Sequence, residues 1–587
     1  MKKTKANILN TPLGCRLLTS LLLHKNLSNH RRIREAAEKG ILLNGCHSPY
    51  QYLQRLLQEH PKLMDTVAIM QDRNITYREL WDESEALANY LHFELVGRKG
   101  ENISICAASS IEGIVAFFAL NRIGLVNARV FNGSQTDKMK YNLNNFASRI
   151  VLTDRNNLAV LSQVIEETKV EAVIVMSECE DVLWKEFESK HPQIRLVSYG
   201  QVMEEGKCIG EHFEEAVSSE DLASILYTSG SSGEPKPISI PNRVYTNMVD
   251  VVCSTTDIVK CDGERVIGVV SHEYPYAAIN CTIMILLMGK TLIMPKHRAD
   301  NSIDFDELME AKPNRIQAIP NFYKLWEQAK QNGTMRGGDF SSLNSVISGG
   351  ERYLNNEKQE LLSFLAGCNA KPLLIDGFGF GELGSATALK FGMHDYFLLM
   401  NGIEAKSIHP ETRKDLPLDE EGILCFTGPT IAAGYYNNAE ATAKSFVKDE
   451  NGKKWFVSDT YGLVHGKKRR LVKLGGRIRE YFITGDGTGN FVKVYAGTVE
   501  DVIMSCPDVS DCIVVPSDSG ATPSPVAYIA INEGGALSKE QIVEDLKVKC
   551  QSLEKFAQPT RYEVETRIVR TNAGKKDYGY YKRMGEF

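Results

Sequence analysis

A loop rich in glycine and hydroxyl groups, residues 227–236, carries the strongest chemical signal in the chain. It reads Tyr-Thr-Ser-Gly-Ser-Ser-Gly-Glu-Pro-Lys and follows a short apolar run, residues 223–226, that predicts a buried strand. Glycine allows backbone conformations that other residues disfavour, and successive exposed N–H groups then form a concave anion site. The hydroxyls add donors, and Lys236 supplies a mobile point charge. We therefore expect this loop to hold a polyphosphate.

The loop does not follow the Walker pattern, because Lys236 comes after Glu-Pro instead of after Gly. A flexible surface loop is the alternative for a string of this composition. The order of residues resembles the phosphate loop of the adenylate-forming superfamily, which contains acyl-CoA synthetases, peptide-synthetase adenylation domains and beetle luciferases. The resemblance implies a catalytic role for Lys236 and nucleotide contacts from Thr228, Ser229, Gly230, Ser231, Ser232, Gly233 and Lys236.

A second glycine-rich segment, residues 343–351, could border the nucleotide. It reads Leu-Asn-Ser-Val-Ile-Ser-Gly-Gly-Glu, and a strand that ends in paired glycines lets a flat ring lie against bare backbone. A tight turn from strand to helix is the alternative. In the resembled family this segment lines both the adenine and the acyl channel. That implies nucleotide contacts from Gly350 and Glu351 and a place for Gly349 in the substrate pocket.

Residues 374–382 resemble the family motif Asn/Asp-x-Tyr-Gly-x-Thr-Glu with two departures. Phe378 replaces Tyr, and Gly381 replaces Thr, so one hydroxyl that would contact phosphate is lost. An aromatic ring beside glycine offers a stacking face for a base. Asp376 can accept from an exocyclic amine, and Glu382 can ligate Mg²⁺, which prefers carboxylates together with phosphate oxygens. The expected nucleotide contacts are Asp376, Gly377, Phe378, Gly379 and Glu382, and the expected metal ligands are Glu382 and Thr228.

Three further residues in the last quarter of the chain match family positions. Asp459 occupies the place of Asp in the family's Thr-Gly-Asp, where a carboxylate can accept from two vicinal ribose hydroxyls, although Val-Ser precedes it here. Arg477 is expected near ribose and phosphate, and Arg479 at the catalytic hinge. Ordinary surface ion pairs are the alternative for these arginines. Their positions follow from the resemblance alone.

Lys575 ends the stretch Arg-Thr-Asn-Ala-Gly-Lys, which resembles the C-terminal lysine loop of the family. A lysine on a loop with glycine can swing in and neutralise charge that develops between a carboxylate and the α-phosphate, and such placed charge is often the largest catalytic contribution. An exposed terminal lysine is the alternative. The resemblance implies that Lys575 is catalytic and contacts the nucleotide.

The resemblance implies that a carboxylic acid attacks MgATP to form acyl-AMP and pyrophosphate. The acyl group would then pass to a thiol, either CoA or the phosphopantetheine of a separate carrier protein. His272, Tyr274 and Tyr276 are expected to line the acid pocket together with Gly349, and Glu273 leaves an amino acid substrate open. Two alternatives remain: a free-standing amino-acid or fatty-acid adenylating enzyme of a biosynthetic cluster, and a degenerate nucleotide-binding protein.

The apolar pattern predicts the elements that position these groups. Strands are expected at 67–70, 75–77, 103–106, 126–130, 265–270 and 291–294, and helices at 50–60, 79–91 and 111–123. This alternation is typical of parallel sheets covered by helices. We therefore expect an α/β fold. It comprises a helical extension (1–45), a large AMP-binding domain of two sheets with flanking helices and a compact β subdomain (46–475), and a smaller mobile α+β domain (476–587). Residues 422–436, which include Gly434 and Tyr435, resemble that subdomain and are expected to be structural.

Composition excludes several classes of function. The net charge of −6 over 587 residues provides no basic field for nucleic acid. Thirteen cysteines without paired spacing favour reduced thiols and a cytoplasmic protein. No apolar run approaches the roughly 18 residues of a transmembrane segment. The N-terminal region is expected to form an amphipathic helix on the main body, with membrane-surface or partner docking as the alternative. The basic run at 467–470 is expected to be a solvated turn.

Overall fold

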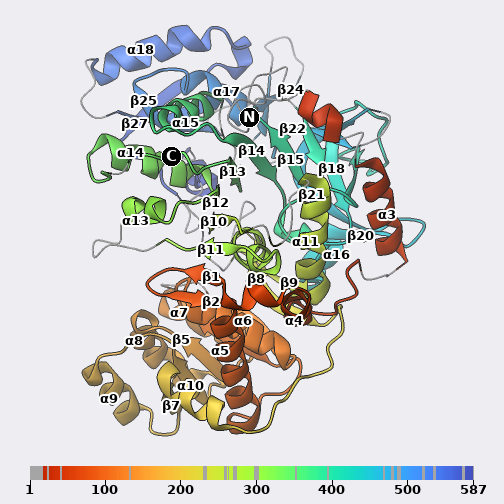
Figure 1. Ribbon diagram of the computed structural model, residues 1–587. Helices are drawn as coiled ribbons and strands as arrows, with labels where there is room; N and C mark the ends of the chain where they lie inside the picture. The colour runs from red at the N-terminus through yellow and green to blue at the C-terminus, as the bar shows by residue number, and fades with distance from the viewer. Residues whose placement is uncertain are drawn as a thin grey trace.

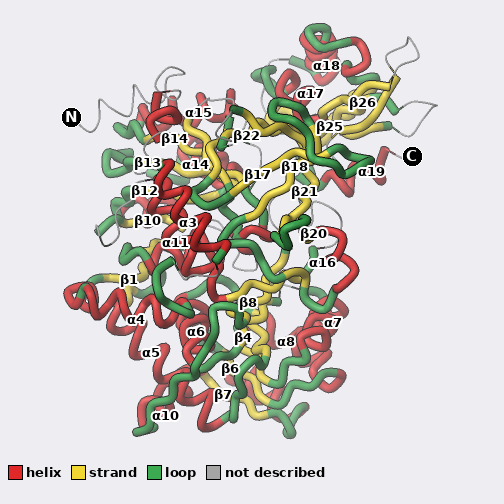
Figure 2. Tube along the Cα trace, turned by 90° about the vertical axis from the view of Figure 1, so that its right-hand side faces the viewer, coloured by secondary structure: helices red, strands yellow, loops and turns green. Residues whose placement is uncertain are grey.

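The computed structural model has two large sheets with covering helices and a smaller α+β part formed by the C-terminal end of the chain (Figure 1). The eight-stranded sheet lies at one end of the molecule, the fourteen-stranded sheet in the middle, and the C-terminal part beside α15 (Asn355–Gly367); Figure 2 shows the same succession. The structure describes residues 17–22, 26–39, 43–130, 134–228, 235–256, 261, 263–268, 274–295, 303–336, 338–350, 353, 355–392, 396–466, 470–477, 481–485, 491–517, 523–532, 537–570 and 576–585.

The eight-stranded sheet is built mainly from strands in the first half of the chain, and residues 434–435 add one strand at its edge. Its order is β19-β9-β8-β4-β3-β5-β6-β7, and the neighbours from β8 to β7 pair in parallel. Every residue of β5 and β6 is buried, as expected for parallel strands covered on both faces. The strands are β3 (Asn102–Cys106), β4 (Val126–Arg129), β5 (Ile150–Thr153), β6 (Ala172–Val175), β7 (Arg195–Ser198), β8 (Leu222–Tyr227), β9 (Pro237–Pro241) and β19 (Gly434–Tyr435). The accompanying helices are α5 (Tyr77–Asn89), α6 (Ile111–Arg122), α7 (Thr136–Phe146), α8 (Arg155–Val164), α9 (Asp181–Lys190) and α10 (Tyr199–Cys208).

The fourteen-stranded sheet has a parallel centre and an antiparallel extension. Strands β1, β11, β10, β12, β13 and β14 pair in parallel, and β15 begins the antiparallel part. The strands of the expected compact subdomain, β17, β18, β21 and β22, join this sheet through the short antiparallel pairing of β16 with β22. The strands are β1 (Val67–Met70), β2 (Asn74–Thr76), β10 (Arg265–Gly268), β11 (Thr291–Ile293), β12 (Arg315–Ala318), β13 (Ser345–Gly349), β14 (Leu373–Phe378), β15 (Ala388–Phe391), β16 (Phe397–Leu399), β17 (Glu404–Ile408), β18 (Gly422–Thr427), β20 (Phe446–Lys448), β21 (Lys454–His465) and β22 (Leu471–Arg477). Its helices include α4 (Pro49–Glu59), α11 (Asn242–Thr256), η4 (Tyr276–Ile283), α12 (Met284–Leu287), α13 (Phe305–Glu310), α14 (Pro320–Gln331) and α16 (Ala439–Ser445).

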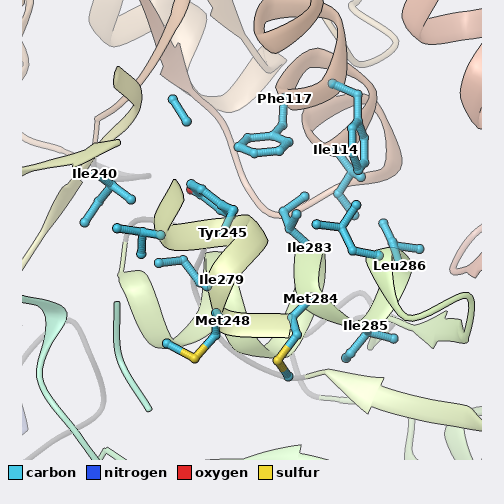
Figure 3. Close-up of a cluster of buried hydrophobic side chains, with 14 of the residues drawn as sticks. Ile114, Phe117, Ile240, Tyr245, Met248, Ile279, Ile283, Met284, Ile285 and Leu286 are labelled. Carbon is cyan, nitrogen blue, oxygen red and sulfur yellow. The ribbon is translucent and has the colours of Figure 1, made fainter. Parts of the chain in front are cut away.

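A hydrophobic layer joins the two sheets (Figure 3). Phe117 of α6, Met248 of α11 and Ile283 of η4 are each at most 3% exposed and belong to one core cluster with Ile240 of β9. Full burial of one such side chain stabilises the fold by about 1.5–3 kcal/mol. Because β9 directly follows the phosphate loop, this layer fixes one end of that loop relative to the large sheet.

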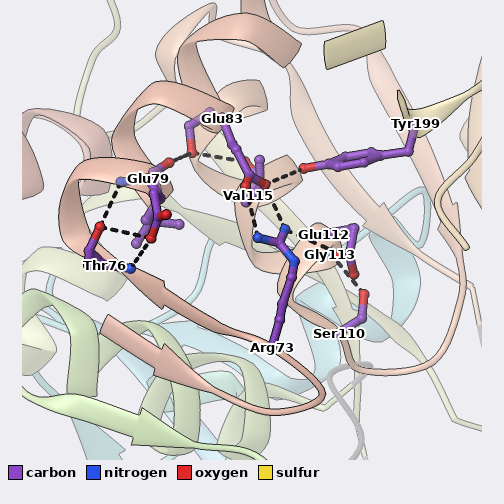
Figure 4. A network of polar contacts seen from close by, with 11 residues as sticks. Arg73, Thr76, Glu79, Glu83, Ser110, Glu112, Gly113, Val115 and Tyr199 are labelled. Atoms are coloured by element: carbon purple, nitrogen blue, oxygen red, sulfur yellow. Dashed lines mark hydrogen bonds and ion pairs between the residues drawn. The ribbon is translucent and has the colours of Figure 1, made fainter. Parts of the chain in front are cut away.

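A polar network also connects the two layers (Figure 4). Arg73, in the hairpin between β1 and β2, donates to both carboxylate oxygens of Glu83 on α5 at 2.9 Å. Tyr199 of α10 donates to the same carboxylate at 3.0 Å, and Arg73 also pairs with Glu112 of α6 at 3.4 Å. The edge of the large sheet is thereby tied to three helices of the eight-stranded sheet.

The C-terminal part has its own sheets and core. β23 (Tyr481–Gly485) and β24 (Phe491–Tyr495) form an antiparallel hairpin, and β25 (Val509–Pro516), β26 (Pro525–Ile531) and β27 (Arg561–Glu565) form a three-stranded sheet. The helices α17 (Ala496–Ile503), α18 (Lys539–Cys550) and α19 (Tyr578–Gly585) complete this α+β part. The expected domain boundary at 475/476 falls inside β22, whose final residues still pair with β21.

The expected N-terminal helix is present as α3 (Leu27–Glu38) and packs on the main body. Ile33 is 1% exposed, and Asn26 donates its side-chain amide to the Thr255 carbonyl at 2.8 Å. Glu38 pairs with Lys453 at 2.9 Å. Packing of the extension on the body is therefore confirmed for its described residues. None of the helices in the described part of the chain has both the length and the apolar character needed to cross a membrane.

Most element bounds expected from the sequence are confirmed within two residues, because they rest on strong apolar runs. The expected solvated turn at 467–470 is wrong for Arg470, which is 1% exposed. Its guanidinium donates to the Leu399 carbonyl at 2.6 Å and to Asn401 Oδ1 at 2.8 Å. Burial lowers the pKa of Arg470 to about 10. Residues 467–469 lie outside the described residues.

Candidate active site

The two ends of the phosphate loop are held together at its base. The Thr228 N–H donates to the Lys236 carbonyl at 2.9 Å, and the Lys236 N–H donates to Thr228 Oγ1 at 3.1 Å. These contacts continue the antiparallel pairing of β8 with β9. The loop therefore closes a hairpin, and Lys236 leaves it where β9 begins.

Several expected site residues lie outside the described part of the structure. They are Ser229, Gly230, Ser231, Ser232, Gly233, His272, Glu351, Arg479 and Lys575. Of Arg477 only the backbone is described. Their expected contacts stay predictions.

Tyr435 connects two expected site residues that are far apart in the sequence. Its hydroxyl donates to Glu382 Oε1 at 2.7 Å, and the Lys236 ammonium lies 5.2 Å from the centroid of its ring. Glu382 is 8% exposed and lies on a single 3₁₀ turn, η5 (Gly381–Leu383). Burial, followed by the charge of Glu382, raises the pKa of Tyr435, so the phenol stays a neutral donor. Tyr435, which was expected to be only structural, therefore contacts two of the expected site residues directly.

Asp459 lies on β21, near enough to Tyr435 for its charge to act on the phenol. Burial and Glu382 raise the pKa of Tyr435 most, a hydrogen bond from Ser445 lowers it, and the charge of Asp459 raises it further. The neighbouring Thr460 pairs with Arg477 of β22. The two expected ribose contacts therefore start from adjacent positions on neighbouring strands.

The Ser458 side chain gives a structural reason for one departure from the family motif. It is 4% exposed and donates to the Leu424 carbonyl at 2.7 Å, while it accepts from the Thr460 N–H at 3.1 Å. A glycine in its place would provide neither contact. Ser458 therefore fixes the strand on both sides of Asp459.

Asp376 is held by two lysines that belong to no recognised motif. Its Oδ2 atom accepts from Lys358 at 2.5 Å and from Lys390 at 3.3 Å, and Asp376 is 7% exposed. Burial lowers the pKa of Lys358. Oδ1 is buried and has no hydrogen-bond partner in the part of the chain that the structure describes, so it is the oxygen that could accept from an exocyclic amine.

The expected stacking residue Phe378 is half-buried at the end of β14. Its ring lies 5.0 Å from Phe380, 5.7 Å from Phe397 and 6.1 Å from Phe426, measured between centroids. Gly379, which follows it, cannot be replaced, because a Cβ there would lie 1.3 Å from the Ser385 carbonyl oxygen. Neighbouring aromatic rings thus fix Phe378 in one orientation.

Tyr276 and Gly349, which are both expected to line the acid pocket, lie in close contact. A Cβ on Gly349 would lie 3.2 Å from Cζ of Tyr276 and 3.2 Å from the Gly377 carbonyl oxygen. Tyr274 lies elsewhere, in the core cluster that contains Tyr227 of β8. The structure therefore brings together Tyr276, Gly349 and Gly377, whereas Tyr274 packs below the phosphate loop.

The ends of the expected Lys575 loop are anchored. Arg570 and Lys576, which flank it, form an antiparallel bridge. Arg570 pairs with Asp511 at 2.5 Å, and Lys576 pairs with Glu500 at 3.2 Å. The loop therefore leaves from and returns to a fixed ionic cluster on β25 and α17.

The residues present fit a Mg²⁺ ion that enters with nucleotide. No group of three His, Cys, Asp or Glu side chains in the described ranges could hold a metal by itself. Glu382 supplies one carboxylate beside Lys236, and Mg²⁺ commonly takes one or two carboxylates and completes its shell with water and substrate phosphates.

Comparison with known proteins agrees with this geometry. Residues 57–436 match the family model described as AMP-binding enzyme, and residues 498–575 match the model described as AMP-binding enzyme C-terminal domain. The chain is 23% identical over 530 residues to a long-chain-fatty-acid–CoA ligase of Salmonella typhimurium, with 85% of this chain and 88% of the relative covered. It is 21% identical over 487 residues to 4-coumarate–CoA ligase-like 2 of Arabidopsis thaliana, with 80% of each chain covered.

Solved structures show the same fold. The anthranilate CoA ligase AuaEII, in complex with anthranoyl-AMP, superposes with a TM-score of 0.75 at 18% identity and covers 92% of this chain and 97% of its own. A benzoate CoA ligase from Burkholderia xenovorans LB400 gives a TM-score of 0.74 at 19% identity and covers 92% of this chain and 100% of its own.

Proposed function

The chain belongs to the AMP-binding enzyme family, and from that premise we propose that it is an AMP-forming acid–thiol ligase. It activates a carboxylic acid with ATP and transfers the acyl group to the thiol of CoA. The single observation that supports this most strongly is the convergence of Lys236 and Glu382 on Tyr435, with Asp459 close by. A phosphate-binding cation, a carboxylate for a metal and a carboxylate for a ribose are the groups that a bound ATP requires.

In the first half-reaction, a carboxylate oxygen of the acid attacks the α-phosphorus of ATP. The bond from that phosphorus to the α,β-bridging oxygen breaks, and pyrophosphate leaves. Lys236 and the loop around it hold the phosphates, and Lys575 neutralises the charge that develops at the α-phosphate. Glu382 would hold a Mg²⁺ ion that enters with ATP, and this ion would neutralise further phosphate charge. No protein nucleophile is required, because positioning and charge carry this chemistry.

In the second half-reaction, the CoA sulfur attacks the acyl carbon of acyl-AMP. The bond from that carbon to the AMP oxygen breaks, AMP leaves, and the thiol proton passes to solvent. The C-terminal part turns about Arg479 between the two steps, and Lys575 withdraws. The thiol of a carrier-protein phosphopantetheine is the alternative acceptor.

The acid is an acyl or aryl carboxylic acid bound beside the contact of Tyr276 with Gly349. Tyr276 is a large ring against bare backbone, and its hydroxyl is buried with no hydrogen-bond partner among the described residues. A polar group on the acid could satisfy that hydroxyl. We place the reaction in the cytoplasm, in keeping with the twelve cysteines among the described residues that form no disulfide.

Acid-dependent exchange of labelled pyrophosphate into ATP, measured over a panel of fatty, aryl and amino acids, tests this function. We expect exchange with at least one fatty or aryl acid, and the matching thioester after CoA is added. Measurable ATP binding without exchange for any acid would contradict the proposal and favour a degenerate nucleotide-binding protein. Transfer to a carrier protein but not to CoA would mean that the activation step is correct and that only the proposed acceptor is wrong.

A further inference from the structure

We propose that Tyr435 is a positioning residue of this site: it orients Glu382 for the metal and holds Lys236 beside it without neutralising either charge. This inference rests on the proposed function, because it assigns Tyr435 a task in the same site. The geometry that supports it is a single ring whose hydroxyl contacts the carboxylate and whose face lies under the ammonium.

The backbone leaves Tyr435 little freedom. It pairs with Ile238 at the edge of the eight-stranded sheet, two residues beyond Lys236. Its N–H donates to Thr442 Oγ1 of α16 at 2.9 Å. The preceding Gly434 has a φ of +151°, and a Cβ there would lie 2.7 Å from Thr442 Cγ2. The ring is therefore placed by the fold itself and needs no ligand to bring it there.

Tyr435 suits this task because it is neutral. A partner that orients a metal-ligating carboxylate through a hydrogen bond typically changes metal affinity 10- to 100-fold. In a direct ion pair, Lys236 and Glu382 would neutralise each other. A buried pair is costly to break, so neither group would be available for a phosphate or a metal. The attraction between the ring face and the ammonium is weak, so Lys236 can leave the ring for a phosphate.

Two substitutions separate the hydroxyl from the ring. Tyr435→Phe keeps the face under Lys236 and removes the hydrogen bond to Glu382. We expect about 10-fold weaker Mn²⁺ binding to the enzyme–ATP complex, measured without acid by electron paramagnetic resonance of free Mn²⁺. Tyr435→Leu removes both contacts and should in addition weaken ATP binding at saturating metal. Neither substitution should change the KM for the acid.

Tyr436→Phe is the matched control. This neighbouring hydroxyl accepts from Asn102 at 2.8 Å, away from Glu382, and its loss should leave Mn²⁺ binding unchanged. Glu382→Gln provides the second test. If Tyr435 acts through Glu382, Tyr435→Phe has little further effect on Mn²⁺ binding in the Glu382→Gln background.

The outcomes separate this inference from the proposed function. If the wild type forms acyl-AMP and Tyr435→Phe binds Mn²⁺ and ATP as the wild type does, the positioning role is wrong and the function stands. If no acid supports acyl-AMP formation but Tyr435→Phe still weakens Mn²⁺ binding, the function is wrong and the positioning role stands. Additive losses in the double variant also overturn the role, because they mean that Tyr435 acts independently of Glu382. Thermal unfolding of each variant identifies any loss that comes from misfolding.

Discussion

The Asp511 carboxylate lies 3.4 Å from the Lys576 ammonium, at the base of the loop that carries Lys575. Asp511 also pairs with Arg570 at the other end of that loop, at 2.5 Å. One carboxylate therefore holds both ends of the segment expected to deliver the catalytic lysine.

Asp511→Asn should loosen this loop. We expect at least a 10-fold slower formation of acyl-AMP, since a hydrogen-bonded partner that sets the geometry of a site typically carries such a factor. Thiolysis of supplied acyl-AMP should change less, because Lys575 withdraws before that step. Single-turnover rates of the two half-reactions check this. Glu563→Gln, an exposed carboxylate near Arg561, is the control; equal losses in both half-reactions would contradict the role.

The same carboxylate predicts a dependence of stability on pH. Burial opposes ionisation of Asp511, but the charges of Lys576, Lys324 and Arg570 keep its pKa below the ordinary 3.8. A depressed pKa stabilises the fold fully above the unfolded value, and this stabilisation is lost as pH falls below about 3.8 toward the folded value. Urea unfolding followed between pH 5 and 3 should show a smaller acid loss for Asp511→Asn than for the wild type.

Gly381 and Pro275 lie in close contact. A Cβ on Gly381 would lie 3.1 Å from Pro275 Cγ, and Pro275 directly precedes Tyr276 of the acid pocket. Gly381→Thr, although it restores the family residue, should therefore raise the KM for the acid and lower the thermal midpoint. Adding Pro275→Ala should relieve both effects, with a coupling on the order of 1 kcal/mol. Gly338→Ala, where the nearest atom is 3.8 Å away, is the control.

If Gly381→Thr alone binds the acid and melts as the wild type does, the contact with Pro275 does not limit this position. The glycine would then have no explanation in the packing.

His30 of α3 predicts a second acid loss of stability. Its Nδ1 accepts from the Gly402 N–H at 3.0 Å, and burial followed by Arg470, Arg34 and Lys453 lowers the pKa of His30 from 6.5 to about 3. The folded state therefore favours the neutral ring, and stability falls as pH drops from 6.5 toward 3, by up to about 1.4 kcal/mol per pH unit.

His30→Asn should flatten the dependence of the unfolding free energy on pH in this range. Ile33→Ala, which removes a side chain 1% exposed against Gly402, should cost about 2–4 kcal/mol at every pH. Leu21→Ala, at 62% exposure, is the control. A wild-type unfolding free energy that stays constant from pH 6.5 to 4 would refute the role of His30.

Lys575→Ala should separate the two half-reactions. Acyl-AMP formation should fall by several orders of magnitude, because the charge opposite the α-phosphate is lost, while thiolysis of supplied acyl-AMP should remain. Rapid quench with a labelled acid measures the first step, and thioester formation from synthetic acyl-AMP measures the second. Lys582→Ala on α19 is the control. Lys576→Ala would not serve, because Lys576 lies in the ionic cluster at the base of the loop. Near-normal adenylation by Lys575→Ala would refute the lysine's role.

Much of the fold follows from the sequence, because strands such as β1 and β6 are continuous apolar runs with clear ends. Lys236 and Glu382 both contact Tyr435, and the charge of Asp459 acts on the same phenol, while their roles in a nucleotide site stay predictions. These residues belong to short motifs that can be read one at a time.

Contacts between distant segments could not be read in this way. Tyr435 lies 53 residues from Glu382, and no local pattern connects them. Lys358 lies on the covering helix α15, and only the folded sheet brings it to Asp376. Arg470 looks like part of a charged run, yet the pairing of β16 with β22 buries it against Leu399. In each case the partner is set by tertiary packing, which overrides local composition.

The central claim is that a carboxylate oxygen attacks the α-phosphorus of ATP at the site around Tyr435. Acid carrying ¹⁸O in both carboxylate oxygens, converted to the CoA thioester, tests this most directly by mass spectrometry of the products. We expect one ¹⁸O in AMP, one in the thioester and none in pyrophosphate. Unlabelled AMP, or label in inorganic phosphate with ADP as the nucleotide product, would contradict the account.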